Sequence, residues 1–110
     1  MAVRSVDKGI SGEDLAVRFL TARGCTIVDR NVRVDADELD IVMRDGASLV
    51  AVEVKTSTNG DDPIEAVDDA KFARFTRAAD AYASFIDRLD IVGVSIGSAG
   101  AEIRWLRAVG

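Results

Sequence analysis

The stretch ELDIVMRDGASLVAVEVKT, residues 38–56, decides the fold. Alternating apolar and polar residues over 38–44 and again over 48–56 predict two neighbouring strands. The dipeptide Asp45-Gly46 between them is typical of the two central residues of a tight hairpin turn. The sequence therefore predicts an antiparallel β-hairpin at this point of the chain.

The turn sets the register of the hairpin and so decides which side chains share a face. Counting outward from Asp45-Gly46 gives the pairs Arg44/Ala47, Asp40/Ala51 and Glu38/Glu53. Alternation then puts Leu39, Ile41, Met43, Val50, Val52 and Val54 on one face, and Glu38, Asp40, Glu53 and Lys55 on the other. Asp40 and Glu53 become diagonal neighbours, about 7 Å apart or less at Cβ, which is within reach of one shared cation.

Two carboxylates this close raise each other's pKa unless a positive charge lies between them. Lys55 on the same face supplies part of that charge, and a divalent ion would supply more. The chain has no histidine and a single cysteine, Cys25, so a metal here must have oxygen ligands, which favours Mg²⁺ or Mn²⁺. The alternative is a solvated polar face with one cross-strand salt bridge.

The segments around the hairpin predict an α/β fold. Ser11 as N-cap and Gly24 as C-terminal stop delimit a first helix. The further expected elements are a strand at 25–33, a long helix at 64–86, and strands at 88–97 and 101–107. A strand, a crossover helix and a further strand imply a parallel pair, so we expect a mixed β-sheet with helices packed on it, in the order αβββαββ.

Length and composition favour one soluble domain. We expect a loose N-terminal tail at 1–10 and a single domain at 11–110, since 110 residues support one compact core. No apolar run approaches the length of a membrane span, so the expected location is the cytoplasm. The net charge of −5 argues against nucleic-acid binding by bulk electrostatics, although a bound metal would offset the local carboxylates. The oligomeric state is open, with a homodimer as one alternative.

Charged residues in two helices have competing interpretations. Glu13 lies in the first turn of the first helix, where spacing alone favours a role in complementing the helix dipole. Lys71 interrupts the apolar stripe of the long helix near its start, beside Asp68. Lys71 either belongs to the carboxylate cluster or extends its amine to solvent from the end of the helix, and both interpretations stay open. Arg74 and Arg77 continue outward and could meet a phosphate backbone, although solvated arginines are the more common case.

These residues resemble a known family. Asp40 followed by Glu53-Val54-Lys55 resembles the PD-(D/E)XK arrangement of restriction-endonuclease-like nucleases. Wider blocks look like the YraN-like family of predicted endonucleases: GEDLAVRFLTARG (12–24), DRNVR (29–33), ELDIV (38–42), LVAVEVKT (49–56) and PIEAVDDAKFAR (63–74). The resemblance implies a three-layer restriction-endonuclease-like core.

The resemblance also implies an activity and the residues that serve it. The expected function is a Mg²⁺- or Mn²⁺-dependent endonuclease acting on DNA, including structured or branched DNA. Asp40, Glu53 and the backbone carbonyl of Val54 would hold the metal, Lys55 would orient or activate the attacking water, and Glu13 would be an additional acidic residue. The candidates for nucleic-acid contact are Lys71, Arg74, Arg30 and Arg33.

Two departures from the family pattern keep an alternative open. Asp37 stands where the family usually has glycine, which adds negative charge beside the site. Thr56 and Ser57 follow Lys55 where a basic residue is frequent. The alternative is a non-catalytic module that retains the nuclease fold and binds nucleic acid or a protein partner.

Overall fold

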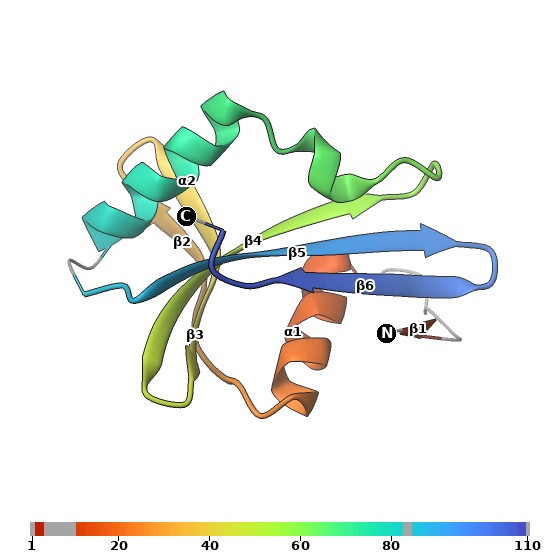
Figure 1. The fold of residues 1–110 in the computed structure, drawn as a ribbon, viewed down its shortest axis with the longest axis horizontal. Helices are drawn as coiled ribbons and strands as arrows, with labels where there is room; N and C mark the ends of the chain where they lie inside the picture. Colours follow the sequence, from red (N-terminus) through yellow and green to blue (C-terminus); the bar gives the residue numbers. More distant parts are fainter. Residues whose placement is uncertain (1, 4–10, 83–84, 110) are drawn as a thin grey trace.

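A computed structural model describes residues 2–3, 11–82 and 85–109. The elements are β1 (Ala2–Val3), α1 (Gly12–Ala22), β2 (Thr26–Val34), β3 (Asp37–Asp45), β4 (Ser48–Ser57), the 3₁₀ helix η1 (Pro63–Ala66), α2 (Asp69–Tyr82), β5 (Arg88–Gly97) and β6 (Gly100–Leu106) (Figure 1). The predicted α/β class and the order αβββαββ are confirmed. The short strand β1 was not predicted, and residues 4–10 of the expected tail lie outside the described residues.

All strands belong to one mixed sheet. Its order is β1-β6-β5-β4-β3-β2, so the strand that carries Glu53 and Lys55 lies in the interior of the sheet, as expected. Strands β4 and β5 are parallel, whereas every other neighbouring pair is antiparallel. The crossover between the parallel strands contains η1 and α2.

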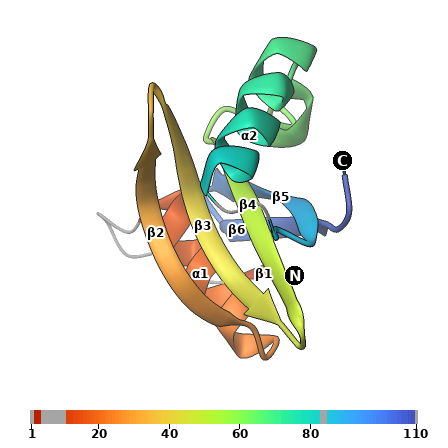
Figure 2. The same cartoon turned by 90° about the vertical axis from the view of Figure 1, so that its left-hand side faces the viewer.

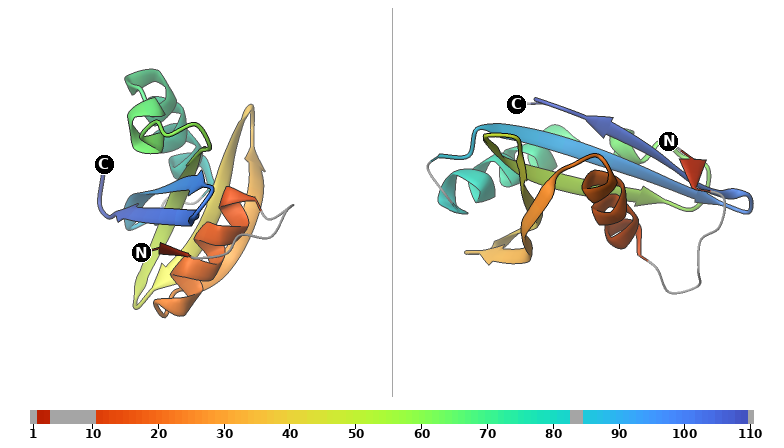
Figure 3. Two further views of the ribbon diagram at one scale, coloured as in Figure 1. Left: turned by 90° about the vertical axis from the view of Figure 1, so that its right-hand side faces the viewer. Right: turned by 90° about the horizontal axis from the view of Figure 1, so that it is seen from below.

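Two helices cover opposite faces of the sheet (Figures 2 and 3). The α1 side holds one core cluster, Leu15, Ala16, Phe19, Leu20, Cys25, Ile41, Met43, Val50, Val52, Val92, Val94, Ala101 and Ile103. The α2 side holds the other, Leu39, Val42, Leu49, Ala51, Phe75, Ala78 and Ala79. The molecule is therefore a helix–sheet–helix sandwich with a core on each side.

The hairpin turn lies one residue later than predicted. Asp45 pairs with Ser48, so Gly46 and Ala47 form the turn, and Gly46 adopts a positive φ of 61° that suits glycine. The predicted pairs Arg44/Ala47 and Asp40/Ala51 are therefore wrong, because Arg44 pairs with Leu49 and Ala51 pairs with Val42. The pair Glu38/Glu53 is wrong as well, because Glu38 pairs with Arg33 of β2. The turn is displaced by one residue on both strands, so the alternation of the two strands stays in step. Side chains of β3 and β4 that were predicted to share a face can therefore still do so along the paired part of the hairpin.

The single helix predicted over 64–86 is two shorter helices. Val67 adopts an extended conformation that ends η1. Asp68 then begins α2, since its carboxylate accepts a hydrogen bond from the Lys71 backbone N–H at 2.8 Å. Phe85, which falls within the helix predicted over 64–86, lies beyond the end of α2, and its side chain is 66% exposed.

Candidate metal centre

The two candidate carboxylates lie where strands β3 and β4 part. The β3–β4 ladder runs from Asp45/Ser48 to Ile41/Val52. Beyond that pair β3 continues alongside β2, and β4 continues alongside β5. Asp40 and Glu53 are the first residues past the last pair, so we call this point the strand fork.

Beyond the last ladder pair, the Asp40 side chain makes a hydrogen bond between β3 and β4 across the strand fork. Its Oδ2 accepts a hydrogen bond from the Val54 backbone N–H at 2.8 Å. Strand β3 also turns over here, because Leu39 packs in the α2-side cluster whereas Ile41 packs in the α1-side cluster. The prediction that Leu39 shares a face with Ile41 is therefore wrong. The hydrogen bond fixes the Asp40 carboxylate against β4.

Asp40 has a strongly raised pKa. Burial and the nearby Glu53 carboxylate together raise the pKa of Asp40 to about 7, and Glu13 adds to the shift. The Val54 N–H and Lys55 act in the opposite direction without cancelling it. The strand fork therefore disfavours the ionised form of Asp40 unless a cation joins it.

Glu53 and Lys55 open onto a small pocket on the α2 side. The Lys55 Nζ lies 3.3 Å from the Glu53 Oε1, and both side chains are partly buried. The pocket has a volume of about 160 Å³ and is lined by Asp37, Glu38, Glu53, Lys55, Lys71, Arg74 and Phe75. Two predicted basic residues of α2 thus share a pocket with two predicted residues of β4.

The beginning of α1 is held close to β4. A capping box joins Ser11 and Asp14, which starts the helix as predicted. A Cβ on Gly12 would lie within 3.0 Å of Thr56 side-chain atoms, so only glycine permits this approach. Glu13, the next residue, lies near enough to Asp40 for its charge to act on it. Thr56 faces α1, so a basic residue at this position would not line the α2-side pocket.

The four basic candidates for nucleic-acid contact fall into different settings. Arg30 is engaged by Glu13 and Asp14 at 3.2 and 2.8 Å. The Lys71 Nζ donates to the Ala66 carbonyl at 3.0 Å at the edge of the pocket. Arg74 lines the pocket and is exposed, and Arg33 is an exposed residue of β2 that pairs with Glu38 in the ladder. The structure therefore groups Lys71 and Arg74 with Lys55, and groups Arg30 with Glu13.

The donor set at the strand fork fits an oxygen-ligated divalent ion. Asp40 and Glu53 supply carboxylates, and burial together with the Glu53 charge raises the pKa of Asp40, so a cation would favour its ionised form. Among the described residues, no group of three or more Asp, Glu, Cys or His side chains is already arranged around one point. An ion here would therefore complete its coordination with backbone oxygen and water, as Mg²⁺ commonly does. The Val54 carbonyl as a ligand remains a prediction.

The chain is similar in sequence to known proteins. Residues 12–94 match the family described as "Uncharacterised protein family UPF0102". The chain belongs to this family. A UPF0102 protein of Solibacter usitatus is 45% identical over 109 residues, which cover 90% of this chain and 82% of that protein. A UPF0102 protein of Arthrobacter sp. is 43% identical over 111 residues, covering 93% and 94% respectively.

The UPF0102 match spans all the blocks that carry the YraN-like resemblance, so the resemblance is confirmed at the level of the family. Among solved structures, SfsA of Pyrococcus furiosus in complex with Ca²⁺ matches with a TM-score of 0.38 and 14% identity. That match covers 86% of this chain, which spans 60% of the SfsA chain. Within the described part of this UPF0102 chain, no helix has the length and apolarity needed to cross a membrane.

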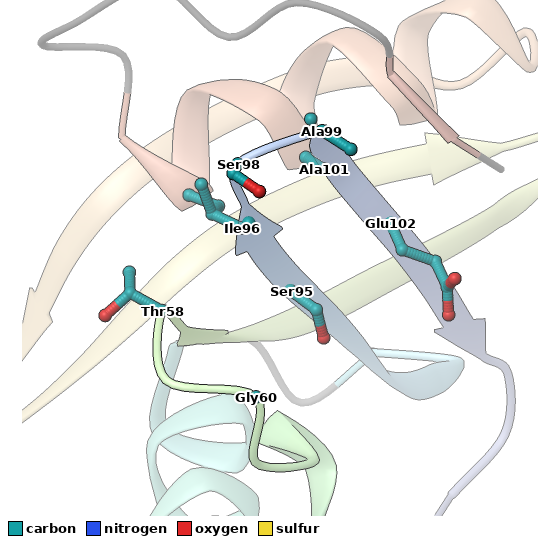
Figure 4. Close-up of a pocket in the computed structure, with 10 residues that line it drawn as sticks. Thr58, Gly60, Ser95, Ile96, Ser98, Ala99, Ala101 and Glu102 are labelled. Atoms are coloured by element: carbon teal, nitrogen blue, oxygen red, sulfur yellow. The ribbon is translucent and has the colours of Figure 1, made fainter.

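Another hollow of this UPF0102 chain lies apart from the strand fork, at the β5–β6 hairpin. It has a volume of about 470 Å³, and Ser95 and Glu102 project toward it from neighbouring strands while Thr58 lies at its rim (Figure 4). It contains none of the predicted site residues. Although it is the larger space, it lacks the paired carboxylates and lysine on which the proposed chemistry depends, so we assign the candidate site to the strand fork.

Two ion pairs near the strand fork were missed from the sequence. Arg77 of α2 lies 3.1 Å from Asp37, so the extra negative charge at position 37 has a partner. Arg30 of β2 reaches Glu13 of α1. Both pairs join residues of different elements, and the spacing along the chain gives no signal for either contact.

The raised pKa of Asp40 predicts a pH-dependent stability for the metal-free protein. Between the unfolded pKa near 3.8 and the folded pKa of about 7, the folded state holds the extra proton, so stability falls as pH rises. We expect the free energy of unfolding to drop by about 2–3 kcal/mol between pH 5 and pH 8 through this group. Urea unfolding with a chelator present would measure the drop, and Asp40→Asn should remove it. An unchanged slope in Asp40→Asn would contradict the assignment.

Proposed function

We propose that the protein is a metal-dependent endonuclease that hydrolyses DNA phosphodiester bonds, with Asp40 and Glu53 as ligands of Mg²⁺ or Mn²⁺. The observation that carries the proposal is the pair of carboxylates at the strand fork. Burial of Asp40 and the nearby Glu53 carboxylate raise the pKa of Asp40 to about 7, so the ionised pair is unfavourable without a cation. The PD-(D/E)XK resemblance supports the same reading, because it singles out the same two residues.

Each residue of the site has a proposed task. A bound divalent ion would polarise a phosphoryl oxygen and lower the pKa of coordinated water. Asp40 is held in one orientation by the Val54 N–H, and the Val54 carbonyl is the proposed backbone ligand. Lys55, beside Glu53 in the pocket, would orient the attacking water and stabilise negative charge that develops on the phosphate. Glu13 would add a further carboxylate from α1.

The proposed partner is DNA, including structured or branched DNA. Lys71 and Arg74 line the same pocket as Lys55, so they can receive phosphates next to the bond that is cut. Arg33 lies across the β2–β3 ladder from Glu38 of the pocket and is proposed as an outer phosphate contact. These few basic side chains would contact phosphates near the bond that is cut. They would not form an extended basic surface, which agrees with the net charge of −5.

Cleavage of a panel of linear, nicked and four-way DNA with Mg²⁺ or Mn²⁺ tests the proposal. We expect metal-dependent cleavage that Asp40→Asn lowers at least a hundredfold, because the substitution removes a negatively charged ligand while keeping the size of the side chain. Asp61→Asn, at an exposed position outside the site, is the matched control and should retain wild-type cleavage. Cleavage that survives Asp40→Asn would overturn the mechanism.

A non-catalytic binding module is the second candidate. The observation that favours it is the ion pair between Lys55 and Glu53, which engages both the lysine proposed to orient the attacking water and a proposed metal ligand. Calorimetric titration with Mn²⁺ separates the two candidates. Binding that Glu53→Ala abolishes supports the metal centre, whereas no binding by the wild-type chain favours the module.

A further inference from the structure

We propose that Arg30 is a positioning residue, which holds Glu13 in place for the metal centre, rather than a residue that contacts nucleic acid. The inference rests on the proposed function and concerns the control of that same site. Arg30 would act through Glu13 of α1, whereas the sequence predicted Arg30 only as a candidate phosphate contact.

The contacts of the Arg30 guanidinium carry the inference. Nε and Nη2 donate to Glu13 Oε1 at 3.3 and 3.2 Å, and Nη2 also donates to Asp14 Oδ1 at 2.8 Å. A guanidinium offers its donors in a rigid, planar arrangement, so two carboxylates bound to it are fixed relative to each other. Among the contacts of the described residues, Glu13 Oε2 takes no part in this arrangement, which leaves that oxygen for another task.

The position of Arg30 links the edge strand to the strand fork. Arg30 pairs with Ile41 in the β2–β3 ladder, and Ile41 is the residue next to Asp40. Gly12, the residue before Glu13, lies directly against the Thr56 side chain of β4, three residues beyond Glu53. Arg30 therefore joins β2, at the position beside Ile41, to the helix that carries Glu13, and it restricts the Glu13 side chain at the end of α1 that packs against β4.

The same contacts make Arg30 a poor phosphate ligand. Its charge is already matched by two carboxylates, and its side chain is 36% exposed. Arg33 is exposed on the same strand. If arginines of β2 served only to bind phosphate, Arg33 and Arg30 should respond alike to substitution. Residues that orient a metal ligand instead affect metal affinity, typically by 10–100-fold.

Calorimetry with Mn²⁺ alone, in the absence of DNA, tests the inference. We expect Arg30→Ala to weaken Mn²⁺ binding about tenfold, because Glu13 loses its fixed orientation. Arg30→Lys should restore part of the affinity, since an ammonium keeps one of the contacts. Arg33→Ala should leave the affinity within twofold.

A double substitution shows whether Arg30 acts through Glu13. If it does, Arg30→Ala combined with Glu13→Ala should bind Mn²⁺ no more weakly than Glu13→Ala alone. In cleavage assays Arg30→Ala should lower kcat with little change in KM, whereas a phosphate contact would raise KM. Urea unfolding of each variant checks that the fold is kept.

The outcomes separate this inference from the proposed function. Wild-type Mn²⁺ binding with an unchanged affinity in Arg30→Ala overturns the role of Arg30 and leaves the metal centre standing. Additive losses in the double variant, or a KM effect equal to that of Arg33→Ala, also overturn it. Mn²⁺ binding without cleavage removes the nuclease proposal only, while a wild-type chain that binds no Mn²⁺ overturns both.

Discussion

Replacing Asp90 with alanine is expected to lower the free energy of unfolding by about 3–5 kcal/mol. Asp90 is fully buried, and its carboxylate accepts hydrogen bonds from Arg88 at 2.9 Å, from the Trp105 indole at 2.9 Å and from the Ala108 N–H at 3.0 Å. Arg88 also reaches Asp45 at 2.8 Å, which ties the end of β3 into the same network. Removing the carboxylate leaves the Trp105 and Ala108 donors without this partner, and the partly buried Arg88 is left with Asp45.

Urea unfolding measures this loss, and two comparisons show that it arises from the buried network. Asp90→Asn keeps the volume and part of the hydrogen bonding, so it should cost less than Asp90→Ala. Arg104→Ala breaks the ion pair with Asp62, in which both side chains are at least 34% exposed, and should cost at most about 1 kcal/mol. A loss in Asp90→Ala no greater than that in Arg104→Ala would contradict the assigned role of the network.

The hairpin could be predicted from local sequence patterns because the alternation of side chains between the two faces of a strand constrains it most. Alternation fixes which side chains share a face, and a turn displaced by one residue on each strand preserves that division. Ile41, Met43, Val50 and Val52 accordingly pack together as predicted. Leu39 did not follow, since β3 leaves β4 at the strand fork and the partner strand changes.

Contacts between distant elements could not be predicted from spacing. The 88–97 segment looked like a continuous apolar strand, and Asp90 within it gave no sign of partners on β6 or at Ala108. The interruption at Val67 and Asp68 had a weak local signal, since Asp is a common N-cap, but the apolar stripe outweighed it. Tertiary packing decides such cases.

Within the candidate site, sequence and structure agree on proximity and differ on arrangement. Glu38, Glu53 and Lys55 share a pocket, as their common face predicted, and α2 brings Lys71 to it. Asp40 instead turns to the Val54 N–H at the strand fork. The direction of a side chain beyond the end of a ladder depends on the divergence of the strands, which no period in the sequence encodes.

Lys55→Ala is expected to lower the rate of DNA cleavage by about 10²–10³-fold without weakening metal binding. Lys55 supplies the positive charge of the α2-side pocket nearest to Glu53, so its removal takes away stabilisation of the negative charge that develops on the phosphate. The metal ligands themselves remain. Because Glu53 loses the ammonium 3.3 Å from its Oε1, its carboxylate becomes a better ligand, and Mn²⁺ affinity should stay level or rise.

Lys55 differs from the carboxylates because its removal should lower the cleavage rate without lowering the Mn²⁺ affinity. Single-turnover cleavage and calorimetry on the same preparations would show both falling in Asp40→Asn, but only the rate falling in Lys55→Ala. Lys55→Arg keeps the charge with a different shape and should retain part of the rate. A Lys55→Ala protein that cuts DNA within threefold of wild type would remove the lysine from the mechanism. Loss of Mn²⁺ binding in that variant would instead mean that Lys55 supports the folded geometry of the strand fork, because an ammonium cannot itself be a ligand.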